Sequence, residues 1–387
     1  MKYFVIAGEA SGDFHASQLI DALRTVDANS SFRFFGGDKM QNAAGIAPVV
    51  HFKHMAYMGF VEVVKHLKEI LSILNIAKKA IVEFNPDAVI LVDYPSFNLK
   101  IAKFAYSKKI PVFYYISPKV WAWKEYRVKD IKKYVTKLYS ILPFEKQFFA
   151  RHGYEILYTG NPSVKEVDEA LKAIPSREEF YEKNHIYSPK PIIALLPGSR
   201  RKEIDNNLPE MLKAALQFTD YQPVIVGAPS VDKKLYTKVI KTEGSYAVPP
   251  VVYDDTFALL KYAGAALVTS GTATLETALV GTPQIACYRM SGSRWVFKLL
   301  SNIINVKYVT LPNLITDSQV IPELLLHNCT AHNIARILEP LLEDSPQRDE
   351  ELEGYKQLRK ILGSQDSAAT AASDIVAQLR EKHTRNA

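Results

Sequence analysis

The sequence predicts an α/β protein with two doubly wound domains, and three observations support this fold class. The chain has 387 residues, whereas a single domain usually spans about 100–200. Short apolar runs alternate with longer amphipathic stretches in both halves of the chain. These runs are almost continuously apolar, which is typical of parallel strands covered by helices on both faces.

Each half of the chain supplies four expected strands and at least one clear helical pattern. The expected strands are Tyr3–Ala7, Ala88–Val92, Val112–Ile116, Leu138–Leu142, Ile192–Leu196, Pro223–Val226, Ala265–Thr269 and Gln284–Tyr288. Helical patterns cover Phe97–Ser107 and Asn207–Phe218. The charged stretch 164–191, which carries Pro175 and Pro189, is the expected junction. We therefore place the domains at 1–165 and 166–365, followed by a tail helix (366–387) that could return to the first domain or to a second subunit of a homodimer.

Composition excludes several classes of protein. Hydrophobic residues make up 48% and charged residues 23% of the chain, a balance that allows sizeable buried cores. The two cysteines, Cys287 and Cys329, lie far apart in sequence, which favours a reducing cytoplasm over a disulfide-built secreted protein. The apolar run near the start is too short for a signal peptide, and no stretch reaches the roughly 18 apolar residues of a membrane span.

Part of the net charge of +7 comes from residues 119–137, which contain seven Lys/Arg and only two acidic residues. Such a segment suits phosphates, nucleic acid or anionic lipid. A solvated helix face would explain the charges equally well.

Two glycine-rich corners follow expected strands and precede helical patterns. The first is GEASGD (residues 8–13), and the second is SGTATLE (residues 270–276). Such a corner lets a ligand approach the backbone closely and exposes N–H groups at the helix start. Tight turns and helix caps would explain the glycines and hydroxyls separately. The clustering of carboxylates and hydroxyls favours a functional interpretation, in which Glu276 could bind the two ribose hydroxyls of a nucleotide.

A third corner, LPGSR (residues 196–200), places arginine beside a glycine turn, which suits phosphate binding. Three such corners in one chain indicate a ligand that carries phosphate. The G-x-G-x-x-G dinucleotide pattern, the P-loop pattern and metal-ligand clusters are missing from the sequence. D-x-D, the common two-carboxylate site for a metal-bound nucleotide sugar, is missing too. We therefore expect no metal and no cofactor, with charge on a leaving group handled by helix dipoles and arginine.

Asp93 directly follows the expected strand Ala88–Val92. A carboxylate at the carboxyl end of a parallel strand lies where open α/β sheets bind ligands. Asp93 could instead cap the next helix, although Ser96 is better placed to do so. We favour Asp93 as a catalytic base.

Residues 55–80 predict a helix with one ordinary core face and a second apolar set beside lysines. Val64, Leu71, Ile73 and Ile76 lie outside the core stripe. Such a helix can lie in a membrane surface, or it can be buried on two sides. Here the membrane-facing interpretation is slightly favoured.

Taken together, these segments resemble the lipid-A-disaccharide synthases, bacterial glycosyltransferases of the lipid A pathway. The resemblance covers most of the chain, from GEASGD to IPELL, and includes AYMGFVEV, DYPSFN, YYISPKVWAWKEYR, ILPFEKQFF, LLPGSR, GTATLE, YRM and LPNLI. GEASGD, SPKVWAW, LPGSR and SGTATLE in this order form a highly specific combination, although no single one of them would be specific.

The resemblance implies a GT-B architecture, with two Rossmann-like domains facing each other across a cleft. It implies an inverting, metal-independent transfer from UDP-2,3-diacylglucosamine to 2,3-diacylglucosamine 1-phosphate. It also implies a cytoplasmic enzyme held peripherally at the inner membrane, with no nucleic acid partner.

The resemblance also assigns roles to residues. Asp93 falls on the family's proposed catalytic aspartate. Residues expected on the donor side are Ser199, Arg200, Ser270, Gly271, Thr272, Glu276 and Asn313. Residues expected on the sugar or acceptor side are Gly8, Glu9, Ser11, Gly12, Asp13, Lys119, Trp121, Trp123 and Arg127. The sequence departs from the family pattern at Ser96, Asn161 and Leu326, where aspartate, histidine and glutamine are common.

Two other functions compete with this transferase. A UDP-sugar 2-epimerase uses a similar two-domain architecture, but it would need further acid–base side chains and would not explain the apolar helix. A basic nucleic-acid or membrane-binding module would explain the charge. It would leave the three corners and Asp93 unexplained.

Overall fold

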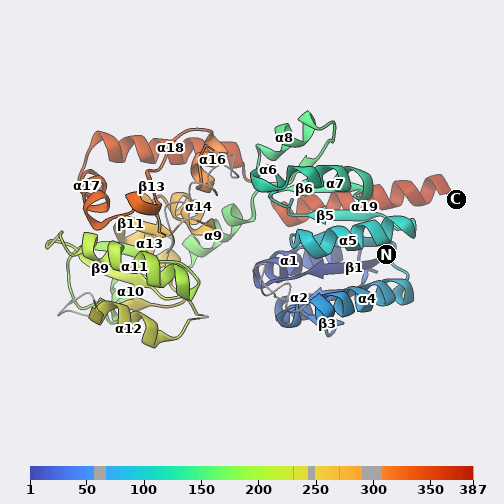
Figure 1. The fold of residues 1–387 in the computed structure, drawn as a ribbon, viewed down its shortest axis with the longest axis horizontal. Helices are drawn as coiled ribbons and strands as arrows, with labels where there is room; N and C mark the ends of the chain where they lie inside the picture. The colour runs from blue at the N-terminus through green and yellow to red at the C-terminus, as the bar shows by residue number, and fades with distance from the viewer. Residues whose placement is uncertain (56–66, 230, 243–248, 270, 290–306, 387) are drawn as a thin grey trace. The chain divides into compact units, whose positions relative to one another are not determined.

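The computed structural model describes residues 1–55, 67–229, 231–242, 249–269, 271–289 and 307–386. The chain forms two compact units, and each is described by itself. The first unit comprises Met1–Pro162 and Ser364–Ala387, and the second comprises Ser163–Gly363. Figure 1 shows the α/β organisation of both units.

Within the described residues, the first unit contains a seven-stranded parallel sheet with the order β3-β2-β1-β4-β5-β6-β7. Its strands are β1 (Lys2–Ala7), β2 (Ser31–Gly36), β3 (Val50–His51), β4 (Ala88–Val92), β5 (Val112–Tyr115), β6 (Lys137–Ser140) and β7 (Leu157–Tyr158). Its helices are α1 (Ala10–Val26), α2 (Asp38–Ala44), η1 (Phe52–His54), α4 (Leu67–Phe84), α5 (Pro95–Ser107), α6 (Val120–Trp123), η2 (Glu125–Arg127), α7 (Val128–Tyr134), α8 (Glu145–Arg151) and α19 (Ser367–Asn386).

Alternate residues of the central strands enter different cores on the two faces of this sheet. Phe4 and Ile6 of β1 pack in one cluster with residues of α4, α5 and α7. Tyr3 and Val5 pack in the other with residues of α1 and α19. Burial on both faces explains why these strands are continuously apolar in sequence.

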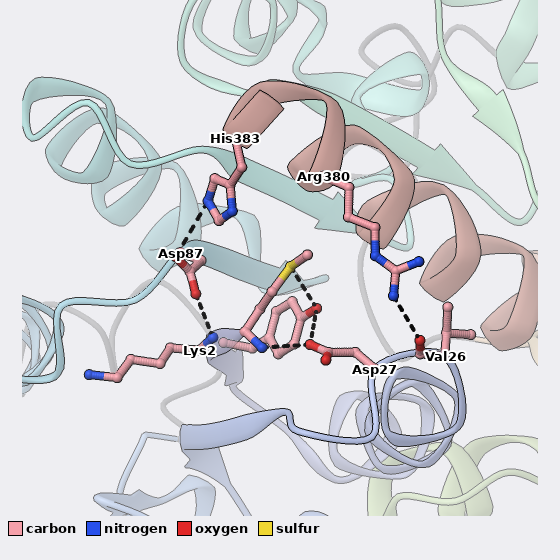
Figure 2. A network of polar contacts seen from close by, with 8 residues as sticks. Lys2, Val26, Asp27, Asp87, Arg380 and His383 are labelled. Atoms are coloured by element: carbon pink, nitrogen blue, oxygen red, sulfur yellow. Dashed lines mark hydrogen bonds and ion pairs between the residues drawn. The ribbon is translucent and has the colours of Figure 1, made fainter. Parts of the chain in front are cut away.

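The tail helix α19 packs against α1 of the same unit, and polar contacts fix its outer end (Figure 2). The His383 ring nitrogen lies 3.6 Å from the Asp87 carboxylate, which also accepts a hydrogen bond from the backbone N–H of Lys2 at 2.7 Å. The Arg380 guanidinium donates to the carbonyl of Val26 at 3.4 Å. The last helix therefore completes the core of the unit in which the chain begins.

Within the described residues, the second unit contains a six-stranded parallel sheet with the order β10-β9-β8-β11-β12-β13. Its strands are β8 (Ile192–Leu196), β9 (Gln222–Val226), β10 (Val251–Val252), β11 (Ala263–Thr269), β12 (Gln284–Tyr288) and β13 (Glu323–Leu325). Its helices are α9 (Pro162–Lys172, whose first residue closes the first unit), α10 (Arg177–Lys183), α11 (Arg201–Ala215), α12 (Lys233–Thr242), α13 (Thr256–Tyr262), α14 (Thr272–Val280), α16 (Leu311–Thr316), η3 (Leu326–Asn328), α17 (Ala331–Leu342) and α18 (Pro346–Leu362).

The strand orders confirm the predicted α/β class with two Rossmann-like units, and they give each sheet one topological switch point. In the first unit the chain moves outward from β1 in one direction and from β4 in the other. In the second unit β8 and β11 have this relation. Ligands of open α/β sheets bind beyond the carboxyl ends of the strands at such a point.

The sequence predicts a domain junction with little regular structure at 164–191. The structure instead has most of α9 and all of α10 in this stretch. A capping box begins α10: the Ser176 side chain accepts from the Glu179 N–H at 3.3 Å, and the Glu179 carboxylate accepts from the Ser176 N–H at 2.9 Å. Ser176 and Glu179 have the S-x-x-E spacing of this motif, so the signal was present in the sequence.

Candidate functional site

The two strands at the first switch point end side by side. Ala7, the last residue of β1, pairs with Val92, the last residue of β4. The GEASGD corner and Asp93 therefore begin at the same edge of the sheet. The sequence predicts that each of these segments follows a strand, but it does not predict that the two strands are neighbours.

Asp93 and the next residue, Tyr94, both adopt the left-handed backbone conformation, with φ of 44° and 47°. Such a conformation costs about 1–3 kcal/mol for each non-glycine residue, and it persists only where the surroundings hold it. Here the Asp93 carbonyl accepts hydrogen bonds from the Asn98 amide at 2.7 Å and from the Tyr114 hydroxyl. Two side chains thus hold the strained corner at Asp93 in place.

Burial raises the pKa of the Asp93 carboxyl to about 6. The neighbouring Glu9 carboxylate raises it further, whereas Lys119 and the Tyr94 N–H act in the opposite direction. A carboxyl group with a pKa near the working pH is suited to general-base chemistry. Asp93 is not the N-cap residue of α5, because Tyr94 holds that position and makes no side-chain capping bond. Ser96, the alternative cap, is the second residue of the helix.

The GEASGD corner is built around close packing. A Cβ atom on Gly8 would lie 2.4 Å from ring carbons of Tyr94, so only glycine leaves room for this ring. Glu9 is partly exposed and Ser11 is exposed, and both are accessible to a ligand.

Asp13 has a structural role, and its predicted contact with sugar stays a prediction. Its carboxylate is buried and accepts backbone hydrogen bonds from Gly37 at 2.6 Å, Lys39 at 3.1 Å and Met40 at 3.3 Å. These N–H groups lie at the start of α2, where a carboxylate satisfies unpaired donors and the helix dipole. The sequence could not distinguish this use from ligand binding, because the partners lie 24 to 27 residues away.

The segment SPKVWAWKEYR follows β5 and folds into α6 and η2. Lys119 is exposed immediately before α6, which ends at Trp123. The half-buried Trp121 donates its indole N–H to the Glu145 carboxylate at 2.9 Å. Arg127 donates to the Ser96 hydroxyl at 3.1 Å, close to the Asp93 corner. Arg127 therefore contacts α5, the helix that follows Asp93. Lys119 lies near enough to the Asp93 carboxyl to lower its pKa.

The second switch point brings the other two corners together. Leu196, the last residue of β8, pairs with Val268 of β11. LPGSR follows the first strand and SGTATLE follows the second. The structure thus gathers two predicted phosphate corners at one edge of the second sheet.

In the LPGSR corner, the Glu203 carboxylate occupies donors that were expected to face a phosphate. It accepts from the backbone N–H groups of Ser199 at 3.0 Å and Arg200 at 3.2 Å. Its other oxygen lies 3.3 Å from the Arg200 guanidinium, which remains 63% exposed. The acid at the third helical position is a capping signal that the sequence interpretation overlooked.

The start of α14 is open by comparison. Gly271 and Thr272 are exposed, and no described side chain caps this helix; Ser270 lies outside the described residues. Burial raises the pKa of the Glu276 carboxyl to about 7, and the nearby Glu166 carboxylate adds to this rise. An uncapped helix start with a carboxyl group one turn further is suited to a diphosphate followed by a ribose.

Asn313 is saturated inside the second unit. Its side chain is fully buried, and its amide donates to the carbonyl of Ile321 and to the Glu323 carboxylate, both at 2.9 Å. Its oxygen accepts from the backbone N–H groups of Val320 and Ile321. These hydrogen bonds give Asn313 a structural role, and its predicted contact with the donor stays a prediction.

The described part of the apolar helix, α4, has an exposed apolar face. Leu71 is 44% exposed and Ile76 is 43% exposed, whereas Ile73 is half-buried against the core. Val82, which the sequence did not single out, is 55% exposed, and Val64 lies outside the described residues. Among the helices described, none is long and apolar enough to cross a membrane.

Each of the two parallel sheets brings two corners together at its own switch point, and the chain has the GT-B fold, which glycosyltransferases and UDP-sugar epimerases share. Solved structures agree at the level of the fold. The UDP-GlcNAc 2-epimerase of Neisseria meningitidis matches with a TM-score of 0.66 and 14% identity, over 98% of this chain and 100% of that one. The glycotransferase of kitacinnamycin matches with a TM-score of 0.61 and 13% identity, over 98% of this chain and 99% of that one.

Sequence relatives identify the family. The family model described as lipid-A-disaccharide synthetase matches residues 3–377. The lipid-A-disaccharide synthase of Acidobacterium capsulatum is 36% identical over 95% of this chain and 93% of its own length. That of Myxococcus xanthus is 36% identical over 97% of both chains. The chain belongs to the lipid-A-disaccharide synthase family and is a glycosyltransferase.

Proposed function

We propose that this enzyme transfers 2,3-diacylglucosamine from UDP to the 6-hydroxyl of 2,3-diacylglucosamine 1-phosphate. The products are a β-1,6-linked lipid A disaccharide 1-phosphate and UDP. Family membership supports the reaction class. The observation that carries the mechanism is the Asp93 carboxyl, held in a strained corner at a switch point with a pKa of about 6.

Asp93 acts as the general base. The acceptor O6–H bond breaks as its proton passes to the Asp93 carboxylate, and O6 forms a bond to the donor C1. The bond from C1 to the UDP oxygen breaks on the opposite face, so the configuration at C1 inverts. Because the carboxyl must be ionised, kcat/KM should rise with pH through about 6 and then level off.

The first unit binds the acceptor. Glu9 and Ser11, accessible beside Asp93, contact its sugar ring, and the cations Lys119 and Arg127 contact its 1-phosphate. The second unit binds the donor. Gly271 and Thr272 at the open start of α14, together with Arg200, stabilise the diphosphate, and Glu276 binds the ribose hydroxyls. UDP leaves without a metal ion, because helix dipole and arginine stabilise its developing charge.

The test is an assay with both lipid substrates in the presence of EDTA, with products separated by mass spectrometry. The proposal predicts disaccharide 1-phosphate and an equal amount of UDP. A transfer that stops with chelator and returns with magnesium would contradict metal independence. Release of a C2-epimerised sugar without disaccharide would point to epimerase chemistry instead.

The exposed face of α4 holds the enzyme at the cytoplasmic surface of the inner membrane, where its acylated substrates reside. Leu71 and Ile76 supply apolar contact, and neighbouring lysines face anionic headgroups. Replacing both residues with serine should lower the fraction that sediments with anionic phospholipid vesicles by roughly tenfold. Ile361→Ser, at a 42% exposed position on α18, is the matched control. Equal sedimentation of the double variant and the control would contradict this role for α4.

Analytical ultracentrifugation tests the remaining expectation, a homodimer.

A further inference from the structure

The loop between β5 and α6 reaches the same sheet edge as Asp93. Val92 of β4 pairs with Tyr115 of β5, so the residues that follow these two strands are neighbours. The backbone N–H of Ser117 donates to the carbonyl of Tyr139 at 3.1 Å, which ties the start of this loop to β6. Lys119 comes two residues later and is exposed.

Glu145, the first residue of α8, lies beneath this loop. Its side chain is only 1% exposed. One carboxylate oxygen accepts the Trp121 indole N–H at 2.9 Å, and the other accepts from the Ser140 hydroxyl. Ser140 ends β6, and its hydroxyl also accepts from the backbone N–H of Leu142 at 3.0 Å. Glu145 therefore connects α6 to the end of β6, a strand that pairs with a neighbour on both sides.

The Trp121 ring is held on its other side as well. It meets the Phe144 ring edge to face, with centroids 5.0 Å apart and an interplanar angle of 85°. A buried carboxylate without hydrogen-bond donors would be strongly unfavourable. Glu145 and Trp121 thus depend on each other, and together they fix the backbone two residues from Lys119.

We propose that Glu145 is a positioning residue, whose buried carboxyl holds Trp121 and thereby keeps Lys119 beside Asp93. The catalytic benefit of this arrangement rests on the proposed function, in which Asp93 is the base. The arrangement itself concerns only residues of the first unit. Sequence patterns assign Glu145 no role, because its partners lie on other elements.

The charges around Asp93 make this positioning measurable. Glu9 from the β1–α1 corner raises the pKa of the Asp93 carboxyl, and Lys119 lowers it. The Tyr114 hydroxyl donates to the Asp93 carbonyl, and the Arg127 guanidinium contacts Ser96 on α5. Of these groups, Lys119 is the one adjacent to the helix that Glu145 supports. Loosening Trp121 should therefore remove the stabilising cation and raise the pKa of Asp93.

The experiment is a pH titration of the Asp93 carboxyl carbon by NMR in the full-length protein labelled at aspartate, with the signal assigned from Asp93→Asn. Trp121→Phe keeps an aromatic ring at this position but removes the indole N–H that Glu145 accepts. We expect the pKa of Asp93 to rise by about half a pH unit or more, up to the roughly 1–3 pH units by which a nearby opposite charge can lower a carboxyl pKa. Glu145→Gln retains an oxygen that can accept the indole N–H, so it should not raise this pKa.

Two further variants complete the test. Tyr126→Phe, at a 67% exposed position of η2, removes a hydroxyl in the same segment and should leave the pKa of Asp93 unchanged. Ser140→Ala removes one of the two hydrogen bonds that hold the Glu145 carboxyl, so it should raise the pKa of Asp93 by less than Trp121→Phe does. This variant provides the test if Trp121→Phe does not fold. An unchanged pKa in folded Trp121→Phe or Ser140→Ala would overturn the proposal. This readout needs no turnover, so it stands apart from the base assignment, which fails only if Asp93→Asn retains activity.

Discussion

Asp93→Asn should abolish most turnover and at the same time stabilise the first unit. The pKa of this carboxyl is raised from its ordinary value of 3.8 to about 6. A difference of one pH unit between the folded and unfolded pKa corresponds to about 1.4 kcal/mol, so ionised Asp93 costs the folded state about 3 kcal/mol above pH 6. Asparagine carries no charge, and it adopts the left-handed conformation at this corner more readily than most residues.

The sign of the pH dependence follows from the raised pKa. Below the unfolded-state pKa near 4, Asp93 is protonated in both states and the variant gains almost nothing from the missing charge. Between pH 4 and 6 the wild type loses stability relative to the variant, and above pH 6 the difference stays constant. At roughly 2–4 °C per kcal/mol, the variant should unfold about 6–12 °C higher at pH 8.

Differential scanning calorimetry at pH 4 and pH 8 measures this difference, and a parallel assay follows turnover, which should fall roughly 10²–10⁴-fold. Titration calorimetry should give an unchanged affinity for UDP, since Asp93 belongs to the other unit. Equal stability of variant and wild type at pH 8, or a gain of the same size at pH 4, would refute the reasoning that burial and Glu9 destabilise this carboxylate.

Three further predictions concern the corners. Gly8→Ala places a Cβ atom 2.4 Å from the Tyr94 ring and should lower kcat roughly 10- to 100-fold. Gly264→Ala, whose Cβ atom would have its nearest contact at 3.5 Å, should keep near-normal kcat, and equal rates in the two variants would rule out the packing argument. Glu276→Gln should weaken UDP binding about tenfold or more by titration calorimetry, and an unchanged affinity would remove it from the ribose site. Asn313→Ala should destabilise the second unit by about 1–3 kcal/mol in calorimetry, because it leaves buried groups unpaired. A normal melting profile together with weakened UDP binding would instead favour the predicted contact of Asn313 with the donor.

The sequence predicted the strands that form nearly continuous apolar runs, but it missed β2, whose run Arg33 interrupts, and β13. Ala88–Val92, Ile192–Leu196 and Gln284–Tyr288 have the predicted limits. The shorter strands β3, β7 and β10 contain two residues each and carry no periodic signal. Their strand conformation comes from pairing with a neighbour in the sheet, which local sequence cannot specify.

Site prediction succeeded for the corners as segments and was weaker for single side chains. The sequence placed GEASGD and Asp93 after strands that the switch point then brings together. It could not predict that Asp13 caps α2, or that the Asn313 side chain forms its hydrogen bonds within the second unit. Capping, internal hydrogen bonding and ligand binding all use the same polar groups. Hydrogen-bond partners distant in sequence decide between these uses.

The supporting residues were missed for a related reason. Asn98 and Tyr114 hold the strained corner, and Glu203 closes the start of α11, yet only Glu203 has a local signature. Asn98 and Tyr114 act through the Asp93 carbonyl just after β4, and this contact can be recognised only when the path of the backbone is known.

The central claim is that Asp93 deprotonates the acceptor in a lipid A disaccharide transfer. The most direct measurement is the pH dependence of single-turnover disaccharide formation, followed by mass spectrometry in wild type and Asp93→Asn. The account predicts a wild-type rate that rises through a pKa near 6, and a variant that is slow at every pH. A variant that forms disaccharide at the wild-type rate with the same pH dependence would contradict it.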